Sequence, residues 1–171
     1  MLGYLEGLRR ADGGYAWEGQ AFSHLTPTFA AIGCHRALGR EVPEKLKVAQ
    51  FVRTHHPSQL KNLEQEHHQF EWEQVEAMLW LGEDASSFRE VVGGWRRPAV
   101  YLKQHEQSSC PILRHEAAAF VCRELLGMPM GELSAEYVKY LESRRRENGS
   151  FNNTPAEAGG DGHVLNTWWG Q

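Results

Sequence analysis

The chain has 171 residues, of which 18 are basic and 22 are acidic, leaving a formal net charge of −4. This balance argues against a dedicated nucleic-acid binder, because phosphate contacts need a basic face. The length fits a single domain with a substantial core, and no apolar run approaches the roughly 20 residues of a membrane span. We therefore expect no nucleic-acid partner and no membrane span.

The N-terminal residues lack the basic head and apolar block of a secretory signal, so none is expected. The three cysteines are Cys34, Cys110 and Cys122, and their spacing is not that of a metal site. Cys34 and Cys122 fall within helical patterns, which predicts that they are small core residues. A reducing compartment is the default for such a chain, and we expect a cytoplasmic location.

Two short patterns alternate along the chain. An aromatic–aliphatic pair occurs at Tyr4-Leu5, Phe51-Val52, Tyr101-Leu102 and Tyr140-Leu141, and a Leu-Gly pair occurs at 38–39, 81–82 and 126–127. The two series interleave with a period of about 40 to 50 residues, which is typical of stacked helical hairpins. Glycine just past the last periodic residue readily ends a helix. Each unit is therefore predicted to hold a first helix carrying the aromatic–aliphatic pair and a second helix closed by Leu-Gly.

The second helices are predicted at 26–39, 70–82 and 113–127. The first of them starts with Thr26-Pro27, a common helix-start signal. No stretch shows sustained β alternation, so the predicted fold class is all-α. The predicted organisation is one repeat domain over residues 1–171, with about three and a half hairpins in units near 1–43, 44–86, 87–131 and 132–171.

One short sequence motif occurs twice. Asp12-Gly13-Gly14-Tyr15 follows the first Tyr-Leu-Glu, and Asn148-Gly149-Ser150-Phe151 follows Tyr140-Leu141-Glu142 at the same offset. Glycine lets the chain turn sharply, and the aromatic residue after it is predicted to fold back onto the helix ends. The middle units lack this turn.

With Arg9 and Arg145 between each Tyr-Leu pair and its turn, the two phrases resemble the repeat of the prenyltransferase and squalene-cyclase superfamily. Cyclases most often have glutamine where this chain has arginine. The resemblance implies an α/α toroid of inner and outer helices, strongest in the first and fourth units. This chain has fewer hairpins than a full toroid, so the resemblance implies an incomplete ring, either part of a longer product or closed by pairing as a homodimer or with a second chain.

The chemistry of that superfamily leaves residue signatures that are missing here. Cyclases use an aspartate-rich motif, whereas the three aspartates, Asp12, Asp84 and Asp161, are scattered singly. Protein prenyltransferases hold zinc with an Asp-x-Cys motif, which does not occur in this chain. Zinc is therefore unsupported, and the cofactor stays unassigned.

A histidine lies near the predicted start of every second helix, where inner helices of this architecture line one rim of a cavity. The candidate ligand-binding residues at this rim are His24, Thr28, His67, Glu71, His115, His163, Thr167, Trp17 and Trp168. Imidazole groups that converge could ligate a metal, for which His24, His67 and His163 are weak candidates. A structural or helix-capping role for the histidines is favoured over a ligand-binding rim, and a rim over a metal centre.

Two functions from different classes follow. The first is a non-catalytic binding or scaffold module whose concave apolar cavity holds an isoprenoid-like ligand or a protein partner. The alternative is a prenyltransferase or terpenoid-class enzyme completed by a second chain or a missing segment. The missing aspartate cluster favours the binding module.

Overall fold

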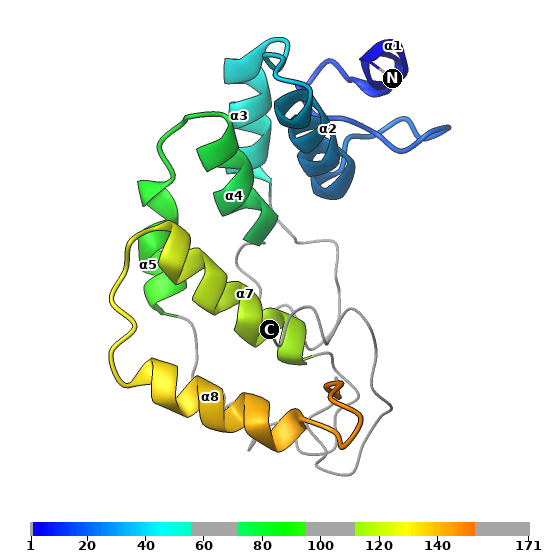
Figure 1. Cartoon of the computed structure of the whole chain (residues 1–171). Coiled ribbons are helices and arrows are strands. Elements are labelled where there is room, and N and C mark those ends of the chain that lie inside the picture. The colour runs from blue at the N-terminus through cyan, green and yellow to red at the C-terminus, as the bar shows by residue number, and fades with distance from the viewer. Residues whose placement is uncertain (1, 56–71, 95–111, 153–171) are drawn as a thin grey trace. The chain divides into compact units, whose positions relative to one another are not determined.

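The computed structural model describes residues 2–55, 72–94 and 112–152, and the elements in these ranges are helices (Figure 1). In chain order they are α1 (Leu2–Leu8), α2 (Leu25–Ala37), α3 (Lys45–Thr54), α4 (Trp72–Trp80), the 3-10 turn η2 (Ser86–Phe88), α5 (Arg89–Gly93), α7 (Ile112–Leu125) and α8 (Leu133–Arg144). The described ranges hold isolated β-bridges but no strand. This confirms the all-α class predicted from the missing β alternation.

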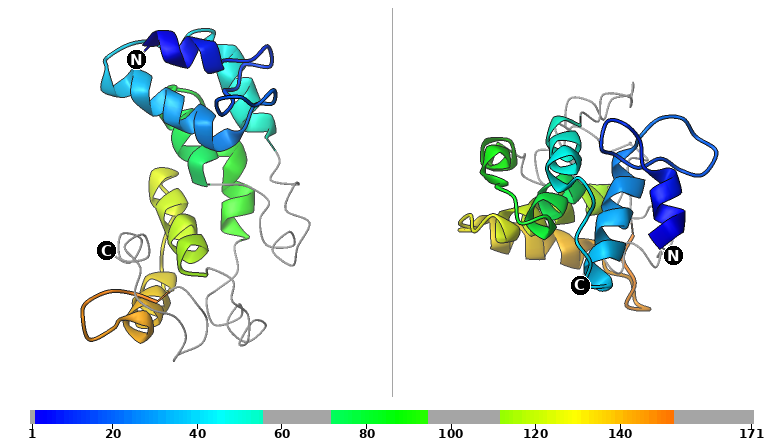
Figure 2. Two further views of the ribbon diagram at one scale, coloured as in Figure 1. Left: turned by 90° about the vertical axis from the view of Figure 1, so that its right-hand side faces the viewer. Right: turned by 90° about the horizontal axis from the view of Figure 1, so that it is seen from above.

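The chain divides into two compact units, Met1–Val91 and Val92–Gln171, which are described separately below. In the first unit, α2, α3 and α4 pack on one another (Figure 2). Their facing sides are apolar at helical spacing, as a core-facing stripe requires. The buried core residues are Leu25, Ala31 and Ile32 of α2, Val48, Ala49 and Val52 of α3, and Val75, Ala77 and Met78 of α4.

The three predicted second helices are present, and each ends at its predicted glycine. Gly39, Gly82 and Gly127 have φ values of +62°, +67° and +59°. After each helix the glycine amide binds one carbonyl and the next amide binds a carbonyl one residue earlier: Gly39 N to Arg36 O and Arg40 N to His35 O, Gly82 N to Leu79 O and Glu83 N to Met78 O, Gly127 N to Glu124 O and Met128 N to Arg123 O. This paired pattern is the Schellman motif.

The second unit is organised around an aromatic cluster between α7 and α8. Ala117, Tyr137 and Tyr140 are buried together. The ring of Phe120 on α7 stacks on that of Tyr137 on α8, with centroids 3.9 Å apart. Phe151, from the turn after α8, packs against the same cluster. The aromatic residue of the turn therefore folds back onto the helices as predicted.

The two copies of the repeated turn share their backbone hydrogen bonds. Arg10 N donates to Gly14 O at 2.9 Å, and Arg146 N donates to Ser150 O at 2.8 Å. The remaining bonds also correspond at an offset of 136 residues: Gly13 N to Arg10 O and Gly149 N to Arg146 O, Ala16 N to Leu8 O and Asn152 N to Arg144 O, Gly14 N to Asp12 Oδ1 and Ser150 N to Asn148 Oδ1. The repeated sequence pattern therefore folds into the same turn in both places.

The predicted burial of the cysteines is confirmed in part. Cys122 is buried, whereas Cys34 is only half-buried, and Cys110 lies outside the described residues. Cys34 and the buried His35 are neighbours on α2, and adjacent positions of a helix point in different directions.

Candidate ligand pocket

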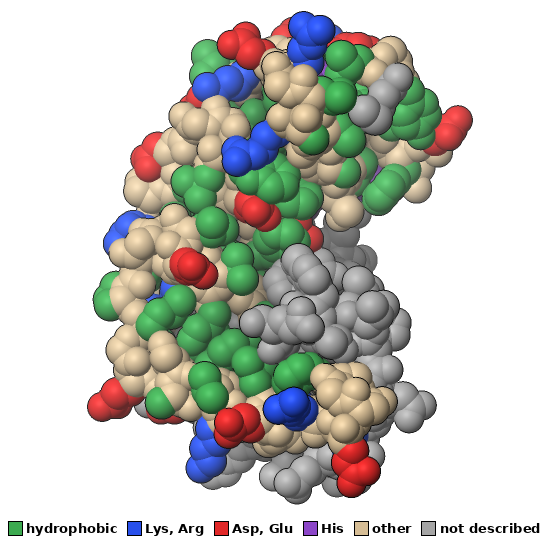
Figure 3. Space-filling model, viewed as in Figure 1, with side chains coloured by type: hydrophobic (Ala, Val, Ile, Leu, Met, Phe, Trp, Pro, Cys, Tyr) green, Lys and Arg blue, Asp and Glu red, His purple; other side chains and the backbone are tan. Residues whose placement is uncertain are grey.

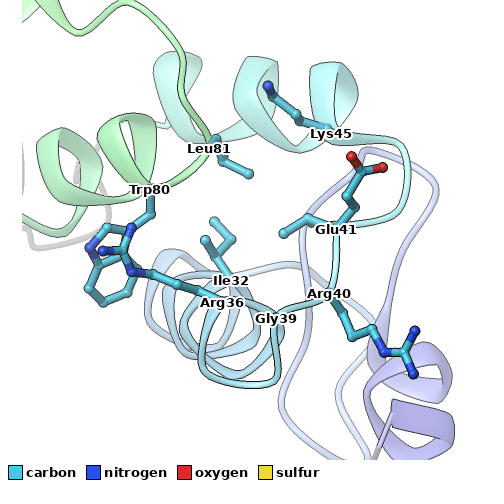
Figure 4. Close-up of a pocket in the computed structure, with 9 residues that line it drawn as sticks. Ile32, Arg36, Gly39, Arg40, Glu41, Lys45, Trp80 and Leu81 are labelled. Carbon is cyan, nitrogen blue, oxygen red and sulfur yellow. The ribbon is translucent and has the colours of Figure 1, made fainter.

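A pocket of about 380 Å³ opens in the first unit where α2 and α4 end and α3 begins. Its lining residues are Ile32, Arg36, Gly39, Arg40, Glu41, Val42, Lys45, Trp80 and Leu81. Figure 4 shows the side chains of Ile32 and Leu81 pointing into this space. Arg40 lines the pocket at its base but its guanidinium points away. Apolar side chains thus face this space, and the charged residues Arg36, Glu41 and Lys45 also line it.

The pocket lies beside two helix ends that are closed by Schellman motifs. Gly39 ends α2 at one side, and Leu81 precedes the glycine that ends α4 at the other. The chain then enters α3 through Glu44, whose φ of +49° is the left-handed conformation. Three residues with positive φ, Gly39, Gly82 and Glu44, therefore lie at or next to residues that line the pocket.

Trp80, which lines the pocket, belongs to a group of packed aromatic rings. Trp80 of α4 stacks on Phe29 of α2 with centroids 4.7 Å apart, and Phe29 also meets Trp72 edge-on at 5.2 Å. The Arg36 guanidinium lies over the outer face of Trp80, 5.6 Å from the ring centroid (Figure 4). A guanidinium in that place gains a cation–π attraction while its N–H groups stay available to a ligand.

The charged side chains at and near the pocket lie close to groups of opposite charge. The Lys45 ammonium pairs with Glu83 at 3.3 Å, and Lys45 also lines the pocket. On α4, burial raises the pKa of the Glu76 carboxyl, the charge of Glu73 raises it further, and Arg36 lowers it by a smaller amount. Arg36 is thus close to one carboxylate and one ring. Apart from Arg40, which points away, the charged residues of the lining are Arg36, Lys45 and Glu41.

Replacing Glu76 with glutamine is expected to stabilise the protein near neutral pH. A folded-state pKa above the unfolded one means that the proton favours folding, so stability is full at acid pH and falls as pH rises through the folded pKa. The Glu76→Gln variant lacks this loss, and its gain should be under about 1 kcal/mol because the site is partly screened by solvent. Thermal melts from pH 3 to pH 8 test this. A variant that gains stability equally at every pH would contradict the prediction.

Of the predicted rim residues, His24 and Thr28 lie at the start of α2, the end opposite the pocket. His24 is the residue before α2, is half-buried, and makes no capping bond with its side chain. Trp17 lies in the loop after the first turn and is exposed. His115 lies in α7, but its side chain is outside the described set, and His67, Glu71, His163, Thr167 and Trp168 lie outside the described residues altogether.

Thr28 is fully buried, and its hydroxyl makes two hydrogen bonds to the backbone. It accepts a hydrogen bond from the Tyr15 amide at 2.8 Å and donates one to the His24 carbonyl at 2.7 Å. The Tyr15 ring is buried beside it, and burial, with the charge of Glu6, raises the pKa of its hydroxyl. Of the predicted rim residues, His24 and Thr28 are linked by the hydrogen bond from the Thr28 hydroxyl to the His24 carbonyl. Trp17 takes no part in this hydrogen bond.

Sequence reasoning missed Arg36, Lys45 and Leu81 as pocket residues. Leu81-Gly82 and Leu38-Gly39 had been identified as helix ends, and a helix end is also where space opens between packed helices. Arg36 and Lys45 have no sequence signal beyond their charge, because cations near a helix C-terminus are common without any ligand.

Within the described ranges, no group of three His, Cys, Asp or Glu side chains is placed to hold a metal ion. None of the described helices has the length and apolarity needed to cross a membrane. Comparison with protein-family models, with curated proteins and with solved structures gives no match.

Proposed function

We propose that the protein is a helical-repeat binding module and that its pocket takes a small apolar molecule with an anionic group. The observation that carries this proposal is the arrangement of Ile32 and Leu81 inside the pocket with Arg36 at its edge. Apolar contacts supply most of the affinity of such sites, and one or two charged groups fix the orientation. A volume of about 380 Å³ lies within the range of small-molecule sites.

An isoprenoid-like molecule is the proposed ligand class. An isoprenoid diphosphate has a methyl-branched apolar chain for the pocket and a diphosphate for the cations beside it. The resemblance of the two turns to the prenyltransferase and squalene-cyclase repeat supports the same class. In this proposal the hairpins form an incomplete α/α toroid, which a second copy or a second chain closes.

Titration with farnesyl diphosphate and with farnesol, followed by calorimetry, tests the proposal. Arg36→Gln should weaken farnesyl diphosphate binding about tenfold, because a hydrogen bond to a charged group contributes about 1.5–3 kcal/mol and Arg36 is partly screened. The variant should leave farnesol binding nearly unchanged. Arg40→Gln is the matched control, since Arg40 points away from the pocket (Figure 4). Equal weakening by both variants, or no binding of either compound, would contradict the proposal.

The alternative is a prenyl-transfer or terpenoid-class enzyme completed by a second chain, and it rests on the resemblance of the two turns alone. It differs from the binding module in its products. Release of diphosphate from farnesyl diphosphate would favour the enzyme, whereas recovery of the intact compound after binding favours the module.

A further inference from the structure

The connection between α2 and α3 is held by few contacts of its own. Residues 40–43, which we call the strap, run along one side of the pocket, and all of them except Pro43 line it (Figure 4). The Arg40 amide donates to the His35 carbonyl at 2.9 Å. Residues 41–43 make no hydrogen bond or ion pair with any other described residue. The conformation of the strap is therefore set at its two ends.

The backbone is left-handed at both ends of the strap. Gly39, just before it, has a φ of +62°, and Glu44, just after it, has a φ of +49°. Glycine adopts this conformation readily, whereas a residue with a Cβ does so at a cost. Glu44 is the single non-glycine residue with positive φ in the part of the chain that the structure describes. Such a residue keeps its conformation only where the surrounding structure supports it.

The support for Glu44 comes from the turn after α1. The Arg9 guanidinium donates to the Glu44 carboxylate at 2.6 Å, whereas the ammonium of Lys47 is 4.0 Å away. Arg145 occupies the position of Arg9 in the other copy of the turn, and its side chain makes no hydrogen bond or ion pair to another described residue. The contact between Arg9 and Glu44 is thus a feature of the first unit, where the pocket lies.

We propose that Arg9 is a positioning residue for the ligand pocket and that it acts through Glu44. Glu44 lies between Val42 and Lys45, and both of these line the pocket. Without the ion pair, Glu44 returns to the right-handed or extended conformations that such residues favour, and the strap leaves its place beside the pocket. The inference rests on the proposed function for what the pocket binds, but not for how the strap is held.

One ion pair is enough for this role because the opposing cost is small. The side chains of Arg9 and Glu44 are 26% and 53% exposed, and charged side chains of both signs occur on the face of the first unit seen in Figure 3. An exposed ion pair is partly screened by water, and its contribution is of the same order as the cost of one left-handed residue. Removing the pair therefore shifts the balance between the two positions of the strap without unfolding the unit.

Limited digestion of the full chain with trypsin tests how the strap is held, with no ligand present. Arg9→Gln should speed cleavage after Arg40 about two- to fivefold, because proteolysis follows the population of the open form and an exposed ion pair shifts that population by this factor. Cleavage after Arg53, near the other end of α3, should keep its rate in the same sample. Glu6→Gln is the matched control, since Glu6 pairs with the same guanidinium at 3.3 Å and its loss leaves the contact with Glu44 in place.

Arg9→Lys keeps the positive charge, so its cleavage after Arg40 should stay close to that of the unchanged chain. Calorimetry with farnesyl diphosphate and farnesol then tests the link to the pocket. Arg9→Gln should weaken the binding of both compounds by the same factor, about two- to fivefold, because the strap lines the pocket rather than contacting one group of the ligand. This result differs from that expected for Arg36→Gln, which should weaken only the diphosphate.

Three results of the digestion would overturn the proposal: no faster cleavage after Arg40 in Arg9→Gln, an equal rise after Arg53, or an equal rise in Glu6→Gln. Binding of both compounds that is unchanged in Arg9→Gln would also overturn it. If neither compound binds the unchanged chain, the proposed function fails, and the digestion alone then decides whether Arg9 holds the strap.

Discussion

Replacing Gly13 with alanine is expected to lower the free energy of unfolding of the first unit by about 3 kcal/mol. Two costs add. Gly13 has a φ of +93°, a conformation that residues with a Cβ rarely adopt. A Cβ at this position would lie 2.6 Å from the Lys47 carbonyl oxygen, a backbone atom of α3 that cannot move without shifting the helix.

Gly39→Ala is the matched control for this prediction. Gly39 also has a positive φ, +62°, but a Cβ there would meet nothing within 4 Å. Its substitution should cost only about 1 kcal/mol, the cost of the backbone conformation alone. Urea unfolding followed by circular dichroism measures both values. Equal losses in the two variants would show that the contact with α3 has no part in the effect.

Thr28→Val is expected to destabilise the first unit by about 2 kcal/mol, although valine has nearly the same shape. The Thr28 hydroxyl is the acceptor for the buried Tyr15 amide, at 2.8 Å. Without it that amide is buried and unsatisfied, and an unsatisfied buried donor costs about 1–3 kcal/mol. The turn, the start of α2 and the Tyr15 ring meet at this hydroxyl, so amide hydrogen exchange at Tyr15 should also speed up.

Thr54→Val provides the comparison for Thr28. Thr54 is exposed at the end of α3, and its hydroxyl donates to the Gln50 carbonyl at 2.9 Å. Water can replace that bond, so the change in unfolding free energy should stay within about 0.5 kcal/mol. If the two variants lose the same free energy of unfolding, the buried hydrogen bond between the Tyr15 amide and the Thr28 hydroxyl is not the cause of the loss.

Local features of this fold are predictable from the sequence. Leu38-Gly39, Leu81-Gly82 and Leu126-Gly127 predict helix ends because a glycine after a periodic apolar run needs only its own backbone freedom to stop the helix. The repeated turn is predictable for the same reason, since its bonds join neighbouring residues. For this reason the repeated sequence pattern and the hydrogen bonds of its turn show the same offset of 136 residues.

The candidate site depends on packing and was therefore missed. The sequence does not place the Thr28 hydroxyl, because a Thr-Pro-Thr helix start is the same whether that hydroxyl faces a cavity or a turn. Burial decides between these, and burial comes from the Tyr15 loop packing against α2. Arg36 and Trp80 are 44 positions apart, and only the pairing of α2 with α4 brings them together.

The shared design of the helix ends and turns bears on how the chain folds. Each Schellman motif joins residues no more than five positions apart, and each repeated turn closes over eight. Closing such short loops costs little chain entropy and takes well under a microsecond. The helices α2, α4 and α7 can therefore set their C-terminal ends before they find their partners. The rate-limiting event that remains is the docking of finished helices. The glycine ends are already formed when docking occurs, so substitutions there should mainly slow folding and change the unfolding rate little.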